Sequence, residues 1–237
     1  MKLLGILGGM SWTSTAEYYR LLNEEVAAQQ GGLHSARLLL HSVDFEEVAI
    51  LQRTGEWDAA GALLADAARG LERVGAQGLI IATNTMHRVA DTIQTAVDIP
   101  LLHIADATGE RIRAAGLTRV GLLATAFTME QAFYTGRLEE NYGLGVMVPE
   151  ADERAETHRI IFDELCKNDV RPASRATYRR IMAGLVQRGA QAIILGCTEI
   201  MLLVGQDDVT VPVFDTTRIH VEAAVQWMLE EESTPPA

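Results

Sequence analysis

The chain has 237 residues, of which 48% are hydrophobic, 22% are charged and 5% are aromatic. This composition excludes a disordered chain, and the length suits one large or two small domains. The formal net charge of −12 excludes the basic surface on which nucleic-acid binding depends.

Short apolar segments rich in Ile, Leu and Val alternate with amphipathic segments along the chain. Such alternation predicts a doubly wound α/β fold with parallel sheets. In chain order, the expected elements are a strand at 3–7, a helix at 15–29, a strand at 38–41, a helix at 58–74, a strand at 79–82, a helix at 105–115, a strand at 120–123, helices at 128–142 and 175–188, a strand at 192–195 and a helix at 217–230.

Nothing in the sequence indicates export or membrane insertion. The apolar segment 3–10 is too short to span a membrane, and no small-residue cleavage site follows it. The two cysteines, Cys166 and Cys197, cannot form a disulfide framework. We therefore expect a cytoplasmic protein that binds neither a membrane nor nucleic acid.

An internal repeat divides the chain into two similar halves. Three pairs of segments match in the same order: 5–8 with 121–124, 75–83 with 189–197, and 99–102 with 211–214. Matches in this order predict a duplication. We therefore expect two pseudo-symmetric α/β domains, the first formed by residues 1–98 and 212–237 and the second by residues 99–211.

Polar residues follow three of the expected strands, at the ends where open α/β sheets bind ligands. Each end leads toward a helix start, where free backbone N–H groups and the helix dipole favour an anion. An acidic protein can therefore still bind an acidic small molecule. The three segments are Gly8-Gly-Met-Ser11, Thr83-Asn-Thr-Met-His87 and Cys197-Thr-Glu199.

The sequence lacks the motifs of common cofactor sites. The glycines at 5, 8 and 9 do not have dinucleotide-binding spacing, and no phosphate-loop motif occurs. Lys2 and Lys167 are the only lysines, which argues against pyridoxal phosphate chemistry. Histidines and cysteines form no cluster with metal-ligand spacing. We expect no cofactor and no metal.

The duplication assigns Thr83 and Cys197 to equivalent positions in the two halves. If a pseudo-two-fold axis relates the halves, these side chains approach one cleft from opposite sides. Reactions that remove a proton from one face of a carbon and return it to the other need this arrangement. In the alternative interpretation both residues have structural roles only: Thr83 caps a helix, and Cys197 is a small buried hydrophobic residue. Their pairing favours catalysis, whereas Cys166, on an expected helix face, has no such partner.

On these motifs the sequence resembles the aspartate/glutamate racemases, a family of cofactor-independent amino-acid racemases. Residues 83–87 correspond to the family motif C-N-T-x-H, and residues 196–199 correspond to G-C-T-E. The segments 33–35, 52–53 and 55–57 are most similar to bacterial L-aspartate/glutamate-specific racemases. The resemblance implies two α/β domains with the active site in the cleft between them, homodimers, and proton exchange at Cα between two opposed side chains.

Thr83 departs from the family motif, which has cysteine at this position. A thiol can be tuned to a thiolate near neutral pH, whereas a hydroxyl is far less acidic. Cys197, beside Glu199 and at a helix start, is the expected base. Thr83 needs help from His87 or a water to exchange a proton. We therefore expect a racemase biased toward the L-enantiomer as substrate.

The resemblance also implies which residues contact the substrate. Gln52 and Lys167 are candidates for the distal carboxylate. If the alignment shifts by one residue, Cys166 takes the family's lysine position, which leaves the choice between aspartate and glutamate open. The other positions that match are Met10, Asn84, Thr85, Thr125, Thr198 and Glu199.

Two other functions fit the same sequence features. The Thr83 substitution is compatible with a decarboxylase or a maleate-type isomerase of the same fold. A non-catalytic module that binds dicarboxylates is the third alternative, against which the retained Cys197 and Glu199 argue.

Overall fold

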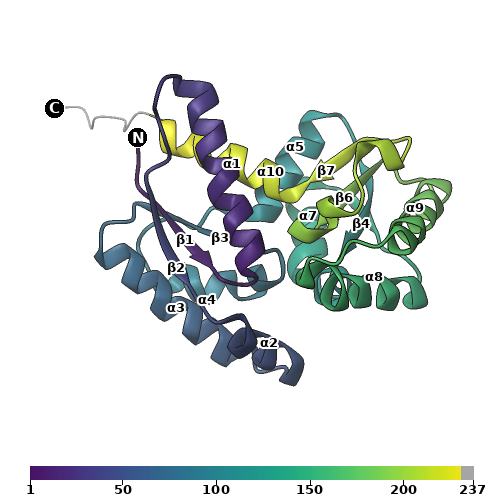
Figure 1. The fold of residues 1–237 in the computed structure, drawn as a ribbon, viewed down its shortest axis with the longest axis horizontal. Helices are drawn as coiled ribbons and strands as arrows, with labels where there is room; N and C mark the ends of the chain where they lie inside the picture. Colours follow the sequence, from purple (N-terminus) through teal and green to yellow (C-terminus); the bar gives the residue numbers. More distant parts are fainter. Residues whose placement is uncertain (231–237) are drawn as a thin grey trace. The chain divides into compact units, whose positions relative to one another are not determined.

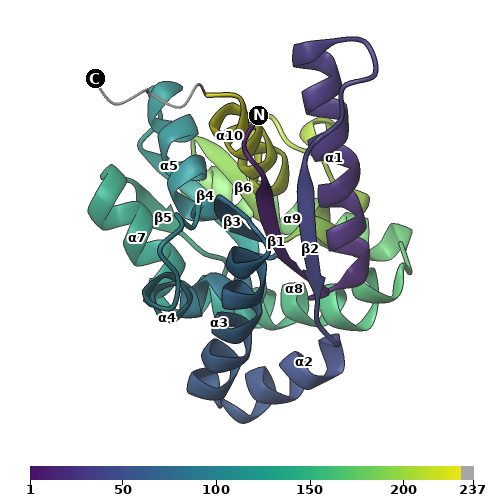
Figure 2. The ribbon, with the colours of Figure 1, turned by 90° about the vertical axis from the view of Figure 1, so that its left-hand side faces the viewer.

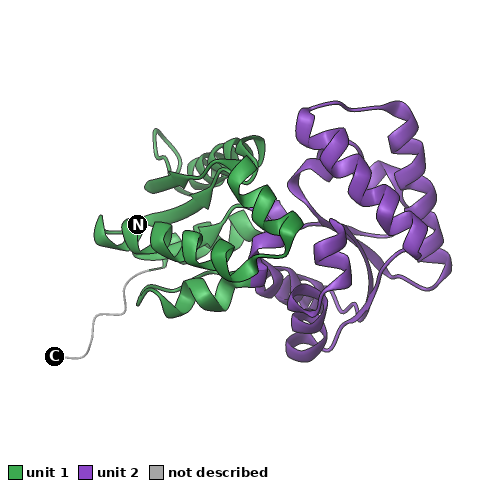
Figure 3. Cartoon of the chain, turned by 90° about the horizontal axis from the view of Figure 1, so that it is seen from below, with its two compact units in different colours: residues 1–82, 89–102, 220–237 green, residues 83–88, 103–219 purple. Residues whose placement is uncertain are grey.

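The computed structural model describes residues 1–230, which form two compact units, each built on a parallel sheet (Figures 1 and 3). Unit 1 contains residues 1–82, 89–102 and the chain from 220, and unit 2 contains residues 83–88 and 103–219. The predicted α/β class with two parallel-sheet domains is confirmed. No helix among residues 1–230 is long and apolar enough to cross a membrane.

The boundaries of the two units differ from the expected domain boundaries, 98/99 and 211/212. Residues 83–88 hydrogen-bond to unit 2, and residues 213–215 form an edge strand of its sheet. Residues 99–102 instead remain with unit 1 because Leu79 pairs with Leu101. The last seven residues of the expected first domain, 231–237, lie outside the described residues.

Unit 1 contains a three-stranded sheet in the order β2-β1-β3, with β1 central and fully buried. Its strands are β1 (Leu4–Gly8), β2 (Leu38–Ser42) and β3 (Gly78–Ile81). Helix α1 (Trp12–Gln30) and the C-terminal part of α10 (Thr216–Leu229) share one hydrophobic cluster with this sheet, while α3 (Trp57–Arg73) packs on its other face (Figure 2). The unit is completed by α2 (Phe45–Thr54) and α4 (Ala90–Thr95).

Unit 2 contains a four-stranded parallel sheet in the order β5-β4-β6-β7. Alternate residues of β6 point into two hydrophobic clusters, with Ile194 on the side of α5 and α7 and Ile193 on the side of α8 and α9. Helices therefore cover both faces of the sheet. The elements are α5 (Ile104–Ala114), β4 (Arg119–Ala124), α6 (Ala126–Glu130), α7 (Ala132–Tyr142), β5 (Gly145–Met147), α8 (Ala151–Asp163), α9 (Pro172–Gln187), β6 (Ala192–Gly196) and β7 (Val213–Asp215).

Within residues 1–230, four short 3-10 helices connect these elements. They are η1 (Thr85–Val89), η2 (Leu165–Lys167), η3 (Thr198–Leu202) and η4 (Gln206–Asp208). η1 begins four residues after β3, and η3 begins two residues after β6, so both follow strand ends that the sequence marks as candidate sites.

The two units share the backbone geometry that a duplication predicts. Gly75 and Gly189 both have φ of 100°, a conformation that glycine adopts without steric cost. Two residues later, Gln77 and Gln191 each accept a backbone N–H bond at the start of the neighbouring strand. The matched segments 75–83 and 189–197 therefore fold alike.

A second pair of glutamines repeats the same side-chain bonds. Gln94 accepts the N–H of Leu101 at 2.8 Å, and Gln206 accepts the N–H of Val213 at 3.0 Å. Each amide nitrogen donates to a carbonyl two residues before that N–H, in both cases at 3.1 Å. Local hydrogen bonding thus follows the repeat to Gln94 and Gln206, which lie outside the segments matched in the sequence.

Candidate functional site

The turn after β1 requires glycine. Gly9 has φ of 93°, and a Cβ built there would lie 2.2 Å from the carbonyl oxygen of Val43. The following Met10 is buried in unit 1, as is Gln52 on α2. These two expected substrate-binding residues thus belong to unit 1, whereas the other candidates belong to unit 2.

Cys197 follows β6 directly and is half-buried beside a carboxylate. Its thiol donates to Oε2 of the buried Glu199, with 3.0 Å between sulfur and oxygen. Burial, and next the charge of Glu199, raises the pKa of Cys197 well above its ordinary value. The expected thiolate at a helix start is therefore not the resting form. In the resting pair, the thiol donates its hydrogen bond to the side chain of Glu199.

Cys166 lies on η2 and packs against the same hydrophobic cluster as Cys197. Burial, followed by the charge of Glu199, raises the pKa of Cys166 to about 12. The sequence assigns Cys166 to a helix face, without an equivalent residue in the other half of the repeat. The charge of Glu199 raises the pKa of both cysteines, so Cys166 shares the electrostatic surroundings of Cys197.

Lys167, the expected contact of the distal carboxylate, is exposed. Its Nζ lies 3.8 Å from a carboxylate oxygen of Asp163, which is also exposed. The preceding Cys166, not Lys167, faces the interior of unit 2. Of the two alignments that the sequence permits, the one with Cys166 on the inner side agrees with the direction of these side chains.

The buried Glu164 holds the η2 segment in place. It accepts a 2.5 Å hydrogen bond from the hydroxyl of Ser174 on α9, and Arg159 lies 2.9 Å away. Its backbone carbonyl accepts the N–H groups of Lys167 and Asp169. These contacts fix the backbone on both sides of Cys166.

Thr83 is half-buried at the start of the segment that leads from β3 into η1. Its carbonyl oxygen lies 2.8 Å from Nδ1 of His87, and the N–H of Ile104 donates to Nε2 of the same ring. A ring nitrogen that accepts carries no proton, so His87 is the neutral tautomer with hydrogen on Nδ1. The sequence suggests that His87 assists the Thr83 hydroxyl, but the ring bonds to the carbonyl.

Asn84 is buried and has an unusual hydrogen-bond balance. Its Nδ2 donates to the hydroxyl of Thr216 at 3.1 Å. Its Oδ1 has no hydrogen-bond partner among the described residues. A buried acceptor without a partner costs about 1–3 kcal/mol, so such atoms call for a functional explanation. The atom accepts hydrogen bonds only, and it therefore fits an ammonium, an amide N–H or a hydroxyl.

Three buried threonine hydroxyls lie within hydrogen-bond distance of one another, and one of them belongs to Thr85, the residue after Asn84. Thr85 Oγ1 lies 3.1 Å from that of Thr125, which lies 3.2 Å from that of Thr128. The sequence predicts Thr85 and Thr125 as substrate contacts from opposite halves, and the structure brings them together. Thr128 joins them because Thr125 caps α6, which places Thr128 three residues into the same turn.

The start of α10 supplies two residues that the sequence analysis missed. Thr216 contacts Asn84, and the hydroxyl of Thr217 donates to that of Thr198 at 3.3 Å. The sequence could have indicated them, because they follow the apolar segment 211–214, which matches 99–102. Such a segment predicts a strand beside β6, and residues after it lie at the same sheet edge.

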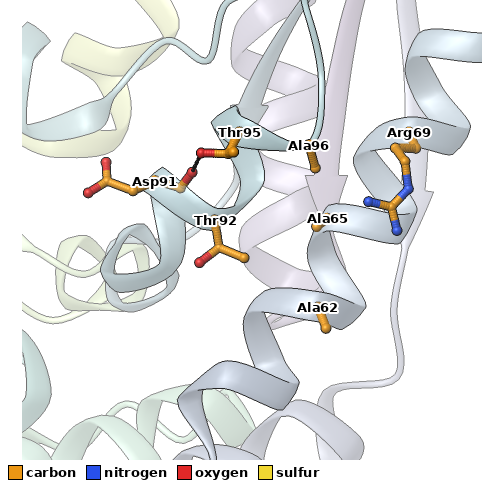
Figure 4. A pocket seen from close by; sticks show the side chains of 7 residues that line it. All are labelled: Ala62, Ala65, Arg69, Asp91, Thr92, Thr95 and Ala96. Carbon is orange, nitrogen blue, oxygen red and sulfur yellow. Dashed lines mark hydrogen bonds between the residues drawn. The ribbon is translucent and has the colours of Figure 1, made fainter.

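Neither a metal-binding cluster nor a catalytic group in the surface hollow is found among the described residues. Among residues 1–230, no cluster of three or more His, Cys, Asp or Glu side chains could hold a metal ion. A surface hollow of 580 Å³ between α3 and α4 is lined by three alanines, two threonines, Arg69 and Asp91 (Figure 4). Its lining includes none of the residues expected to react with or bind a substrate.

The family model, two of the solved structures and one of the curated relatives that match this chain all belong to amino-acid racemases or their homologues. The family model for Asp/Glu/hydantoin racemases matches residues 7–224. The chain is 51% identical to a Yersinia pestis protein assigned as an Asp/Glu racemase; the match covers 97% of this chain and 100% of that one, with a TM-score of 0.92. An aspartate racemase homologue from Pyrococcus horikoshii OT3 is 36% identical over 97% of this chain and 100% of its own, with a TM-score of 0.83. The broad specificity amino-acid racemase RacX of Bacillus subtilis (strain 168) is 22% identical over 98% of this chain and 100% of its own.

Proposed function

Because the chain belongs to the Asp/Glu/hydantoin racemase family, we propose that it racemises an acidic amino acid, with Cys197 and Thr83 as the groups that exchange the Cα proton. The relatives named above include an aspartate racemase homologue and a broad specificity amino-acid racemase. Racemases are isomerases, and the chain is an isomerase of this type. The reaction uses no cofactor, and the enzyme acts as a cytoplasmic homodimer.

The observation that carries the proposal is the orphaned acceptor of Asn84. Buried Oδ1 repels a carboxylate oxygen but accepts the N–H of an α-ammonium group. Amino acids carry that group, whereas malonates and maleate do not. The acceptor therefore favours racemisation over the decarboxylase and maleate-isomerase alternatives. Thr85, Thr125 and Thr198 supply hydroxyls for the substrate carboxylates.

Cys197 is the base for the L-enantiomer in this proposal. Glu199 receives the thiol proton, and the thiolate then removes the Cα proton of the substrate. The Thr83 hydroxyl donates its proton to the opposite face of Cα and regains one from water, while Glu199 releases to water the proton that it took from the thiol. Because a hydroxyl is a weak resting base, the reverse direction starts with a higher barrier.

Proton NMR in deuterated buffer tests the proposal against its alternatives. L-Aspartate or L-glutamate should lose its Cα proton signal, and Cys197→Ala should abolish the loss while Cys166→Ala retains it. New vinyl or methylene signals from maleate or a malonate would show that the protein is a maleate-type isomerase or a decarboxylase and not a racemase. Binding of these compounds without any change would indicate a non-catalytic module.

A further inference from the structure

We propose that Thr216 is a positioning residue that fixes the direction of the Asn84 side-chain amide and thereby selects substrates that carry an amine. This inference rests on the proposed function, because it assigns the substrate's ammonium group to Asn84. Thr216 follows β7 at the start of α10 and is fully buried.

The direction follows from counting hydrogens along one chain of bonds. The Thr216 hydroxyl lies 3.0 Å from the backbone oxygen of Leu195, which can only accept. The single hydroxyl hydrogen is therefore used toward Leu195. Toward Asn84, 3.1 Å away on its other side, the same oxygen can offer only a lone pair.

Asn84 must consequently present its NH₂ group to Thr216. The reversed amide would set two oxygens against each other at this distance, without a hydrogen between them. With the NH₂ group committed, Oδ1 points away from Thr216 and stays buried without a partner among the described residues, in a side chain that is only 3% exposed. One backbone carbonyl thus determines, through two side chains, that the group offered to the ligand is an acceptor.

The same bonds join the two strand ends that carry the proposed acid and base. Asn84 is the neighbour of Thr83, and Leu195 lies two residues before Cys197. Thr216 therefore links both ends within unit 2 through one hydroxyl. Asn84 can rotate its amide once this hydroxyl is removed, because an apolar side chain does not distinguish NH₂ from oxygen.

The test compares ligands with and without an amine. In Thr216→Val, which keeps the side-chain shape, KM for L-aspartate should rise about tenfold, whereas the inhibition constant of succinate should change less than twofold. Thr216→Ser should stay within about twofold of wild type for both. Thr157→Val is the matched control, because Thr157 is also fully buried and donates to a backbone carbonyl, that of Glu153.

A double-mutant cycle separates positioning from a general loss of structure. If Thr216 acts through Asn84, Thr216→Val should add less than twofold to KM in an Asn84→Ala background. Equal losses for L-aspartate and succinate, or a full tenfold effect in that background, would overturn the proposal. Thr216→Ala serves in the same cycle if the valine variant does not fold.

A readout without ligand distinguishes failure of this inference from failure of the proposed function. The side-chain NH₂ signals of Asn84, assigned by their loss in Asn84→Ala, should shift in Thr216→Val and stay in place in Thr157→Val. If the enzyme exchanges no amino acid but these signals shift, the proposed function fails and the positioning role stands. Unshifted signals would refute the positioning role whatever the activity.

Discussion

The thiol of Cys197 rests protonated because it is half-buried beside a carboxylate. Its pKa is raised by burial first and by Glu199 next. In a Cys166→Ala background, alkylation of Cys197 by iodoacetamide should therefore accelerate from pH 7 to pH 10 without reaching a plateau. Glu199→Gln removes the negative charge and lowers the pKa of the thiol, so the same curve should move to lower pH.

Saturating L-aspartate should protect Cys197 from alkylation, both in Cys166→Ala and in the variant that also carries Glu199→Gln. Alkylation rates with the same pH dependence in Glu199→Gln would show that the charge of Glu199 does not act on the thiol.

Single residues of the site differ in how far the sequence predicts them. Thr85 and Thr125 were expected as contacts from both halves, and their hydroxyls meet. Thr216 could not be singled out, because its role depends on a bond to a backbone oxygen on another strand. The direction of Cys166 and Lys167 was equally hidden, since one residue of shift in a 3-10 helix exchanges inside and outside.

The segment Thr83–Arg88 is held to the start of α5 by one histidine. His87→Ala would leave the carbonyl of Thr83 and the N–H of Ile104 without partners and open a cavity. We expect a loss of about 3 kcal/mol in the free energy of unfolding. Urea unfolding measures this loss, with the exposed His34→Ala as the control that should cost under about 0.5 kcal/mol.

Nitrogen-15 NMR of the histidine rings checks the same element. His87 should show hydrogen on Nδ1 at pH 7.5. Hydrogen on Nε2 instead would mean that the ring does not accept from Ile104 and is free to act on the Thr83 side.

Elements with a strong period were predicted well, and short or polar ones were not. The expected helix at 58–74 corresponds to α3, and the expected helix at 105–115 corresponds to α5, each within one residue at both ends. The expected helix at 128–142 is divided into α6 and α7 because Gln131 adopts an extended conformation. α8 escaped prediction because charged residues occupy most of its first half.

Folding stability of the whole chain depends on a neutral histidine in the core of unit 1. His220 donates from Nε2 to the carbonyl of Leu102 and accepts the hydroxyl of Tyr18 on Nδ1, 2.9 Å away. Burial lowers the pKa of His220 from 6.5 to about 4. The unfolded chain binds the proton more readily, so stability is full above pH 6.5 and falls as the pH drops toward 4.

This group alone should remove about 2 kcal/mol between pH 7 and pH 5. In urea unfolding, His220→Gln should be less stable than wild type at pH 7 but should lose less between pH 7 and pH 5. If both proteins lose the same stability between pH 7 and pH 5, protonation of His220 does not cause the loss.

At the scale of the molecule, repetition was the most informative property of the sequence. It predicted two parallel-sheet units, and the recurring bonds of Gln94 and Gln206 follow it closely. The unit boundaries could not be read in the same way. They depend on which sheet a three-residue strand such as β7 joins, and apolar pattern alone does not decide that.

The most direct test of the central claim measures Cα hydrogen–deuterium exchange on separate L- and D-enantiomers of aspartate and glutamate. A thiol on one side and a hydroxyl on the other should make wild type exchange the L-enantiomer readily and the D-enantiomer about a hundredfold more slowly, since a barrier difference of ~3 kcal/mol has this effect. Thr83→Cys should bring the two rates together. Equal exchange of both enantiomers by wild type would contradict the assignment of Thr83 and Cys197 as an unequal acid–base pair.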